Sequence, residues 1–266
     1  MTVEPDPRTE LALTSHVDFI RETSVREPGG GVLEEDGLFL YAGPHPLPVL
    51  VNGAIRMKPD LPAGEVLDRA RAFFGSRGRG FSVYGLVGPD DDLIEAADAA
   101  GMVAFGDPAP LMVLEGSVPP ADVPSEVRIE RVTTPEQVSD AAAVCADAYA
   151  VYGMPHDVAT ACLTPRTMLV PDTAVVVAYD EDGPVATAGA LVARRVSYIS
   201  WVGTVQRAMR RGLGDAVTRA ATAAGLDLGG EITALVASPM GAPVYRRIGF
   251  VDVGQHASRV AMSAPV

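Results

Sequence analysis

Residues 206–221 read QRAMRRGLGDAVTRAA, a basic loop with two glycines that leads into a series of small and apolar residues. From Leu213 onward the apolar residues recur three and four positions apart, which predicts a helix, and Gly225 stands where its C-terminal cap belongs. The N-terminus of such a helix exposes unpaired N–H groups and the positive end of the helix dipole. Because glycines let an anion approach the backbone and three arginines add charge, the stretch predicts a phosphate or pyrophosphate site.

The segments around this loop predict a mixed α/β domain. Val-rich runs between residues 174 and 205, separated by the turn sequence Asp-Glu-Asp-Gly and by two arginines, predict three antiparallel strands before the loop. The fold class expected is α/β (α+β), with a mostly antiparallel twisted sheet flanked by helices. The other predicted elements are a strand at 127–132, helices starting at Pro135 and covering about 157–168, a strand at 231–237, a helix at 241–248, and a closing pair of strands at 249–254 and 257–262.

A domain boundary is predicted in the segment SVPPADVPS at residues 117–125. It holds three prolines and no large hydrophobic residue, which is typical of a linker. We therefore expect one domain over residues 1–120 and a second over 121–266.

The first half repeats features of the second. Gly53 and Gly101 lie 48 residues apart, and Gly203 and Gly249 lie 46 residues apart, in similar strand and helix contexts. The spacing indicates an internal duplication. The segment of the first half that corresponds to the basic loop, MKPDLPAGEVLDRARAFF, has no basic cluster, so no anion site is predicted there.

Three kinds of nucleotide loop could use the basic stretch. A P-loop requires Gly-Lys-Ser/Thr, which is absent. A Rossmann fingerprint needs a small residue where Val217 stands, and it normally opens its domain instead of following three antiparallel strands. The loop that binds acetyl-coenzyme A (acetyl-CoA) is the remaining kind.

Residues 126–266 resemble the GCN5-related N-acetyltransferase (GNAT) family. The pyrophosphate loop of that family reads Arg/Gln-x-x-Gly-x-Gly/Ala, and residues 209–214 (MRRGLG) match it except at Met209. A second match is SPMGAPVYRRIGF at 238–250, which ends in Tyr-x-x-x-Gly-Phe as the family segment does. For the first half the resemblance is architectural only. The chain thus looks like a tandem GNAT protein with a degenerate N-terminal copy.

The resemblance implies where acetyl-CoA would bind. The backbone of Val202, Gly203 and Thr204 would hold the pantetheine arm, in a slot where this strand splays from the strand at 231–237. Tyr245 would protonate the departing thiolate, unless it is a core tyrosine. Ser238 would bind the pantetheine or a water, or would cap the strand end. The expected acetyl-CoA contacts are Val202, Gly203, Thr204, Val205, Met209, Arg210, Arg211, Gly212, Leu213, Gly214 and Asp215.

The implied reaction is direct attack of a neutral amine on the thioester. A backbone N–H near Thr204 or Val205 would hold the developing oxyanion. An amine with a pKa near 10 must first lose a proton, so a base or a water chain is needed. Many relatives carry a Glu on the fourth strand, but SYISWVGT has none. The remaining candidates are Glu130, His156 and Asp157, while Trp201 would line an acceptor pocket or belong to the core.

Composition limits the other possibilities. The 266 residues carry a formal net charge of −13, which disfavours nucleic acid and favours a cationic amine, either a small molecule or a peptide. Two cysteines and four scattered histidines predict neither a disulfide framework nor a metal site. The acidic first twenty residues and the absence of a long apolar run predict a cytoplasmic protein without a membrane span, a monomer or homodimer.

The sequence is also compatible with two other functions. The missing carboxylate on the fourth strand and Met209 in the loop would suit an acyl-CoA-binding or interaction module without catalysis. Alternatively, the enzyme could use its first domain to form the acceptor site.

Overall fold

The computed structural model describes residues 6–262, and this part of the chain divides into two compact units. The first unit holds residues 6–9, 20–111 and 252–262, and the second holds residues 10–19 and 112–251. Residues 117–124 contain no helix or strand, as their proline content predicts. The domain boundary expected at 120/121 stays a prediction.

The second unit is built on a mixed sheet with strand order β6-β11-β10-β9-β8-β7. Strands β7 to β10 pair antiparallel with their neighbours, and β10 pairs parallel with β11. The mostly antiparallel sheet confirms the predicted fold class. The strands are β6 (Ala109–Glu115, of which 112–115 belong to this unit), β7 (Arg128–Arg131), β8 (Thr173–Asp180), β9 (Gly183–Ala193), β10 (Val196–Thr204) and β11 (Ile232–Val236).

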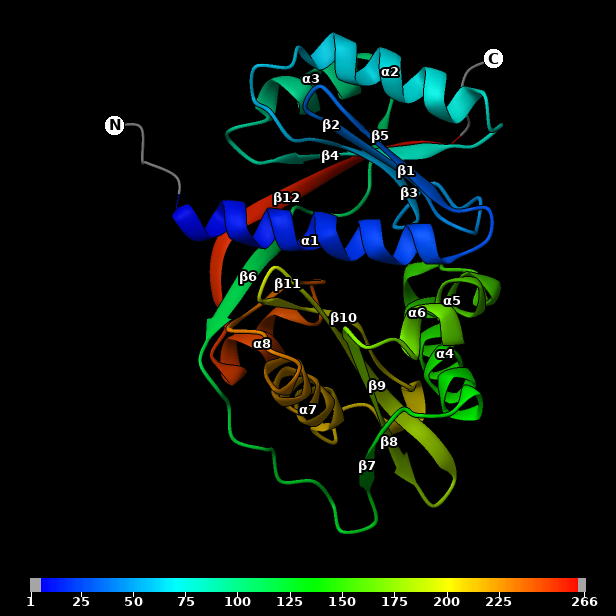
Figure 1. The fold of residues 1–266 in the computed structure, drawn as a ribbon, viewed down its shortest axis with the longest axis vertical. Helices are drawn as coiled ribbons and strands as arrows, with labels where there is room; N and C mark the ends of the chain where they lie inside the picture. Colours follow the sequence, from blue (N-terminus) through cyan, green and yellow to red (C-terminus); the bar gives the residue numbers. More distant parts are fainter. Residues whose placement is uncertain (1–5, 263–266) are drawn as a thin grey trace. The chain divides into compact units, whose positions relative to one another are not determined.

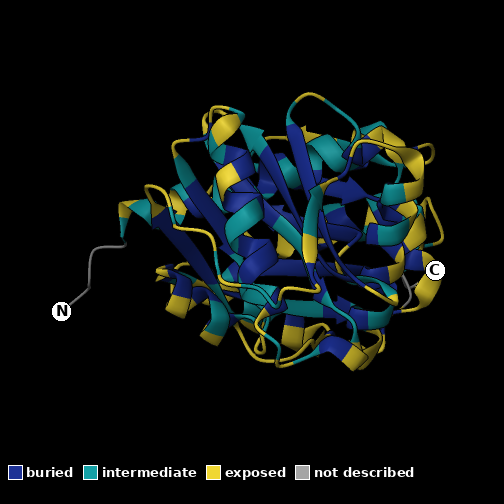
Figure 2. Cartoon of the chain, turned by 90° about the horizontal axis from the view of Figure 1, so that it is seen from below, coloured by how far each residue is buried: buried dark blue, intermediate teal, exposed yellow. Residues whose placement is uncertain are grey.

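Helices cover both faces of this sheet, with α4, α5 and α6 on one face and α7 and α8 on the other (Figure 1). Helix α4 begins with the predicted Pro135, and Thr134 and Gln137 cap it reciprocally. The strands and the inner helix faces are buried (Figure 2). The helices are α4 (Pro135–Tyr149), η1 (Ala150–Tyr152), α5 (His156–Cys162), α6 (Pro165–Met168), η2 (Gln206–Ala208), α7 (Leu213–Asp227) and α8 (Ala242–Ile248).

Three local predictions are wrong. The helix expected over 157–168 is two short helices, because Thr164 and Pro165 start a new one. The closing pair of strands is a single strand, β12 (Val251–Ala261). Helix α7 does not end at Gly225 but continues to Asp227. Gly225 is required there because a Cβ atom at this position would lie 2.0 Å from the Ser197 Oγ.

The first unit repeats part of this topology. Its sheet has the order β1-β2-β3-β4-β12, in which only β3 and β4 pair in parallel. The path β2-β3-α2-β4-α3 therefore matches the path β9-β10-α7-β11-α8 of the second unit. The elements are α1 (Pro7–Arg26, of which residues 10–19 belong to the second unit), β1 (Gly31–Glu35), β2 (Leu38–Ala42), β3 (Asn52–Arg56), α2 (Ala63–Gly75), β4 (Phe81–Leu86), α3 (Asp91–Ala99), β5 (Val103–Ala104) and β12.

Candidate functional site

The central feature of the second unit is the point where β10 and β11 separate. The two strands pair over three residues only, ending with Tyr198 opposite Ala234. Beyond that pair β10 continues to Thr204 and β11 continues to Val236 without pairing with each other. The predicted splay is therefore confirmed. An open edge between two strands can accept an extended ligand as an additional strand.

Strand β10 bulges directly after this separation. Trp201 has a φ of +51°, and the register with β9 shifts between Ser200 and Gly203. A bulge adds one residue to the strand, so Trp201 does not alternate in register with Ile199 and Gly203. A bulky residue with positive φ is strained, and such strain concentrates at functional sites.

Two carbonyl groups at the bulge of β10 accept hydrogen bonds from side chains of α4. The Cys145 Sγ donates to the Trp201 oxygen at 3.4 Å, and the Tyr149 hydroxyl donates to the Val202 oxygen at 3.2 Å. Gly203 then packs directly on α4, since a Cβ atom there would lie 3.0 Å from the Ala148 Cβ. Hydrogen bonds and packing from α4 thus hold in place the strand that carries the predicted pantetheine contacts.

The end of β10 limits which amide could stabilise an oxyanion. The Val205 N–H donates to the Val185 oxygen at 2.9 Å, so it is not available. Its carbonyl accepts from the Ala208 N–H of η2 at 3.0 Å. Of the two amides expected from sequence, only that of Thr204 stays a candidate.

The arginines of the loop are held by a carboxylate that sequence reasoning missed. Asp180, at the end of β8, accepts two hydrogen bonds from Arg207 at 2.9 and 3.1 Å and one from Arg211 at 3.2 Å. Arg211 also contacts Glu126 at 3.0 Å. Arg210 has a φ of +62° and makes no hydrogen bond or ion pair within the described part of the chain. It is therefore the loop arginine whose charge is available to a ligand.

These ion pairs predict a specific acid response. The Arg207 hydrogen bond, followed by the Asp182 N–H and Arg211, lowers the pKa of Asp180 from 3.8 to about 2. A depressed pKa stabilises the fold fully above pH 3.8, and this contribution is lost as the pH falls through about 2. We expect Asp180→Asn to make the free energy of unfolding less pH-dependent between these values, measured by urea titration.

The control for this experiment is Asp182→Asn. The Asp182 side chain is 75% exposed and lies 3.8 Å from Arg207, so its loss should leave the slope unchanged. Equal slopes for wild type and Asp180→Asn would contradict the assignment.

The N-terminus of α7 presents unbonded backbone donors. Gly212, with a φ of +78°, is its N-cap and provides no side-chain cap. The first hydrogen bond of the helix runs from the Ala216 N–H to the Gly212 oxygen. The amides of Leu213, Gly214 and Asp215 have no acceptor among residues 6–262. The predicted anion site therefore has the donors that a diphosphate requires.

The other loop residues offer fewer groups that could contact an anion. Leu213 is 1% exposed and packs in the core, so only its amide can face a ligand. The Met209 N–H donates to the Gln206 oxygen at 3.3 Å. The Asp215 carboxylate accepts from the Arg219 Nε at 2.6 Å, four residues further along the helix.

Tyr245 on α8 combines a buried ring with an unbonded hydroxyl. The residue is 7% exposed and its ring lies 5.9 Å from that of Phe250. Its hydroxyl makes no hydrogen bond to any residue between 6 and 262, and its oxygen is not one of the buried unbonded polar atoms of this range, so it keeps accessible surface. Burial raises its pKa, so the phenol is protonated at neutral pH. The ring is part of the core, and the hydroxyl is free to donate.

Ser238 lies in the turn between β11 and α8. Its Oγ accepts from the Gly241 N–H at 3.1 Å, and its carbonyl accepts from Gly241 and Ala242. These bonds close the turn that leads into α8, and both the catalytic role and the capping of the strand end stay predictions.

None of the three bases proposed from the sequence lies at β10. Glu130 lies on β7, at the far edge of the sheet, where it contacts Arg128 at 2.6 Å and Gln137 at 3.3 Å. His156 and Asp157 line a pocket of about 600 Å³ between α4, α5 and α6.

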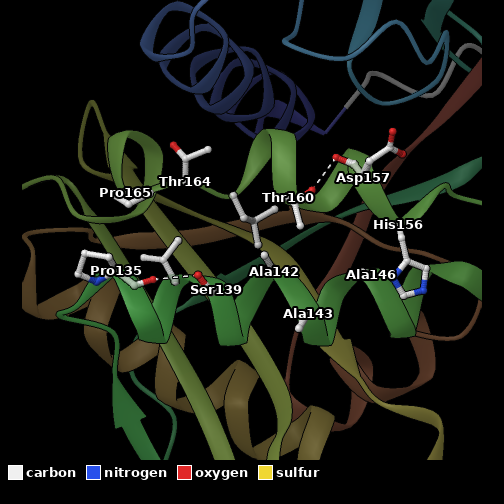
Figure 3. A pocket seen from close by; sticks show the side chains of 12 residues that line it. Pro135, Ser139, Ala142, Ala143, Ala146, His156, Asp157, Thr160, Thr164 and Pro165 are labelled. Carbon is white, nitrogen blue, oxygen red and sulfur yellow. Dashed lines mark hydrogen bonds between the residues drawn. The ribbon is translucent and has the colours of Figure 1, made fainter.

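This pocket lies against a different side of α4 from the one that contacts β10. Ala142, Ala143 and Ala146 of α4 line it together with Thr160 of α5 (Figure 3). The α4 residues that bond β10 are Cys145 and Tyr149. The pocket and the splay are therefore separate features.

Residues 6–262 contain neither a metal-binding cluster nor a membrane-spanning helix. No cluster of three or more His, Cys, Asp or Glu side chains is arranged to hold a metal ion there. None of the helices in this range is both long and apolar enough to cross a membrane.

No family model and no curated protein matches the sequence. Solved structures do match its fold across nearly the whole chain. A GCN5-related N-acetyltransferase from Kribbella flavida is 22% identical, with a TM-score of 0.69 over 95% of this chain and 94% of its own. One from Sphaerobacter thermophilus is 13% identical, with a TM-score of 0.61 over 98% and 95%.

A tandem GNAT protein from the clavulanic acid biosynthesis pathway is 14% identical, with a TM-score of 0.57 over 97% of this chain and 96% of its own. The chain therefore has the GNAT fold, and the coverage extends over both units. The predicted fold class and the resemblance noted in the sequence are confirmed at the level of the fold. Whether the first unit is a degenerate copy stays a prediction.

Proposed function

We propose that the chain is an acetyl-CoA-dependent N-acetyltransferase that acts on a primary amine, with its site in the second unit. The proposal rests on one juxtaposition. The open edge of β10 ends beside the unbonded N-terminus of α7, since a Cβ atom at Gly214 would lie 3.5 Å from the Thr204 Oγ. The unbonded hydroxyl of Tyr245 projects from α8, the helix that follows β11. The GNAT fold supports the same assignment.

Each part of the site has a role that its chemistry suits. The amides of Leu213, Gly214 and Asp215, with the Arg210 guanidinium, would hold the diphosphate. The β10 edge from Val202 to Thr204 would hold the pantetheine arm. Acetyl-CoA, when bound, supplies an acyl thioester. Tyr245, protonated at neutral pH because burial raises its pKa, would donate a proton to the sulfur.

The acceptor would be the neutral form of a small-molecule or peptide amine. The net charge of −13 raises the local concentration of cationic molecules, which favours amines over acidic acceptors. Such an amine arrives protonated and must release a proton before it attacks.

A second candidate is an acyl-CoA-binding module without catalysis. It is favoured by β10, which carries no Asp or Glu. Calorimetry with acetyl-CoA, followed by a thiol-release assay over a panel of amines, separates the two. Binding with turnover of an amine supports the enzyme, whereas binding without turnover on the whole panel favours the module. The absence of binding would contradict both.

The cofactor site itself predicts the effect of a single substitution. A Leu side chain at Gly214 would fill the space between the first turn of α7 and Thr204. We expect Gly214→Leu to weaken acetyl-CoA binding about 100-fold, or about 2.7 kcal/mol, as measured by calorimetry.

Gly214→Ala is the matched control. Its Cβ would make an ordinary contact 3.5 Å from the Thr204 Oγ, so binding should change little. Both variants should unfold at temperatures close to that of wild type. Full affinity in Gly214→Leu would show that acetyl-CoA does not use this cradle.

A further inference from the structure

The proposed reaction needs a group that accepts the proton of the amine. The candidates from sequence are on the far edge strand or in the pocket beside α5, and neither place faces the splay. A side chain that accepts the proton at the splay must therefore come from another part of the chain.

Tyr198 occupies the point where the strands separate. It is the last residue of β10 that pairs with β11, and it is 4% exposed. The preceding residue, Ser197, points toward α7, because its Oγ lies 2.0 Å from where a Cβ of Gly225 would be. Side chains alternate along a strand, so Tyr198 points to the opposite face, toward α4. The bulge begins three residues later, at Trp201.

A histidine from α1 bonds this tyrosine. The His16 Nδ1 lies 2.6 Å from the Tyr198 hydroxyl oxygen. Phe19, one turn further along α1, stacks on the Tyr198 ring with centroids 5.0 Å apart. Asp18 forms an ion pair with Arg194 in the turn before β10. All these residues belong to the second unit. Three contacts from one helix thus fix the imidazole against the phenol.

We propose that Tyr198 and His16 form the proton-accepting pair for the amine, with Tyr198 as the catalytic residue and His16 as a positioning residue that takes up the proton. The inference rests on the proposed function. As the C–N bond forms and the C–S bond breaks, the proton of the amine nitrogen passes to the Tyr198 Oη. The hydroxyl proton of Tyr198 passes to the His16 Nδ1, and the sulfur takes a proton from Tyr245. The imidazolium then returns a proton to the Tyr245 phenolate through solvent.

The surroundings suit a relay through a neutral phenol. Burial raises the pKa of Tyr198, as does the neighbouring Tyr245 phenol, while a backbone hydrogen bond from Val236 opposes them. A phenol that stays protonated can pass on a proton without becoming an anion. The titratable and charged groups near the pair include Tyr245 of α8, Tyr149 of α4 and the Asp18–Arg194 ion pair.

The decisive variant is His16→Asn. The Asn Oδ1 can accept the hydrogen bond of Tyr198 much as Nδ1 does, but it cannot take up a proton. We expect His16→Asn and Tyr198→Phe each to lower kcat/KM for the amine about 100-fold at pH 7, with acetyl-CoA affinity unchanged. Because the two residues act as one relay, the double variant should be little worse than either single variant.

The pH profile distinguishes proton uptake from simple positioning. In wild type, kcat/KM calculated on the concentration of the neutral amine should fall as the pH drops through the range in which an imidazole becomes protonated, near 6.5 for an ordinary imidazole. This decrease of kcat/KM at low pH should be absent in His16→Asn. The control is His45→Asn, which removes another histidine whose Nδ1 accepts a hydrogen bond, from the Leu47 N–H at 3.1 Å. Its rate and pH profile should equal those of wild type.

A second measurement needs no turnover. In ¹⁵N-histidine NMR spectra of the free protein, the His16 Nδ1 should be unprotonated and should shift in Tyr198→Phe. A protonated Nδ1, or full activity and an unchanged pH profile in His16→Asn, would overturn the pair while leaving the proposed function intact. If wild type binds acetyl-CoA but acetylates no amine, the proposed function fails and the pair fails with it.

Discussion

Replacing Tyr245 with phenylalanine is expected to lower kcat for acetyl transfer about 1000-fold, or about 4 kcal/mol, because the variant has no acid to protonate the departing sulfur. The hydroxyl has no hydrogen-bond partner among residues 6–262, so its removal breaks no internal bond. The ring stays in the core beside Phe250. Stability and acetyl-CoA affinity should therefore remain close to the wild-type values, and only the chemical step should slow.

The matched control is Tyr179→Phe. Tyr179 lies on β8 and is 6% exposed, which is close to the 7% of Tyr245. Unlike that of Tyr245, its hydroxyl donates a hydrogen bond, to Asp140 at 2.8 Å. Its loss should reduce stability by about 1 kcal/mol and leave kcat unchanged. Parallel losses of binding and turnover in Tyr245→Phe would show that the tyrosine is structural. Single-turnover kinetics with saturating acetyl-CoA would separate the two outcomes.

Local sequence was sufficient to predict the loop and the helix it precedes, whereas the splay of the strand was implied only by the family resemblance. The loop and the helix depend on contiguous residues, because glycines before an apolar 3.6-residue period define a helix N-terminus. Asp180 could not be found in this way, since it meets Arg207 only after β8 and β9 fold back on each other. The bulge at Trp201 had no signal, because tryptophan has no preference for positive φ.

The contacts of α1 were also beyond the sequence. His16 and Tyr198 are 182 residues apart, and a single histidine without a spacing motif resembles any surface histidine. At Gly225, by contrast, a sequence signal was present but was interpreted wrongly. A glycine near a helix end predicts a cap, but this one is required by close packing on Ser197, and the left-handed residue is Gly229 with a φ of +95°.

The first unit contains a cluster of ion pairs near the ends of β3 and β4. Arg56, the last residue of β3, has a side chain that is 1% exposed. It bonds Asp90 at 2.8 Å and Asp92 at 2.5 and 2.9 Å, on either side of the start of α3. These hydrogen bonds raise the pKa of Arg56, so it is charged at any accessible pH. β3 corresponds to β10 in the topology, yet it ends in a buried cation paired within the unit.

We expect Arg56→Met to lower the free energy of unfolding by about 3 to 5 kcal/mol, measured by urea titration. The reason is that Asp90, whose side chain is 9% exposed, would keep a buried charge without its counter-ion. Acetyl-CoA affinity of the folded protein should not change, because the proposed site is in the second unit. Asp92→Asn should cost much less, since the Asp92 side chain is 60% exposed.

A compensating variant tests the electrostatic explanation directly. In Arg56→Met/Asp90→Asn no charge is left buried, and the Asn oxygen can still accept from the Leu86 N–H, which Asp90 bonds at 2.8 Å. Most of the lost stability should return, because removing both charges avoids the desolvation cost that one unpaired charge incurs. If the double variant were as unstable as Arg56→Met, the loss would come from packing of the arginine stem. If the Arg56→Met variant bound more acetyl-CoA molecules per chain than wild type, the ion-pair cluster would instead be blocking a second acetyl-CoA site.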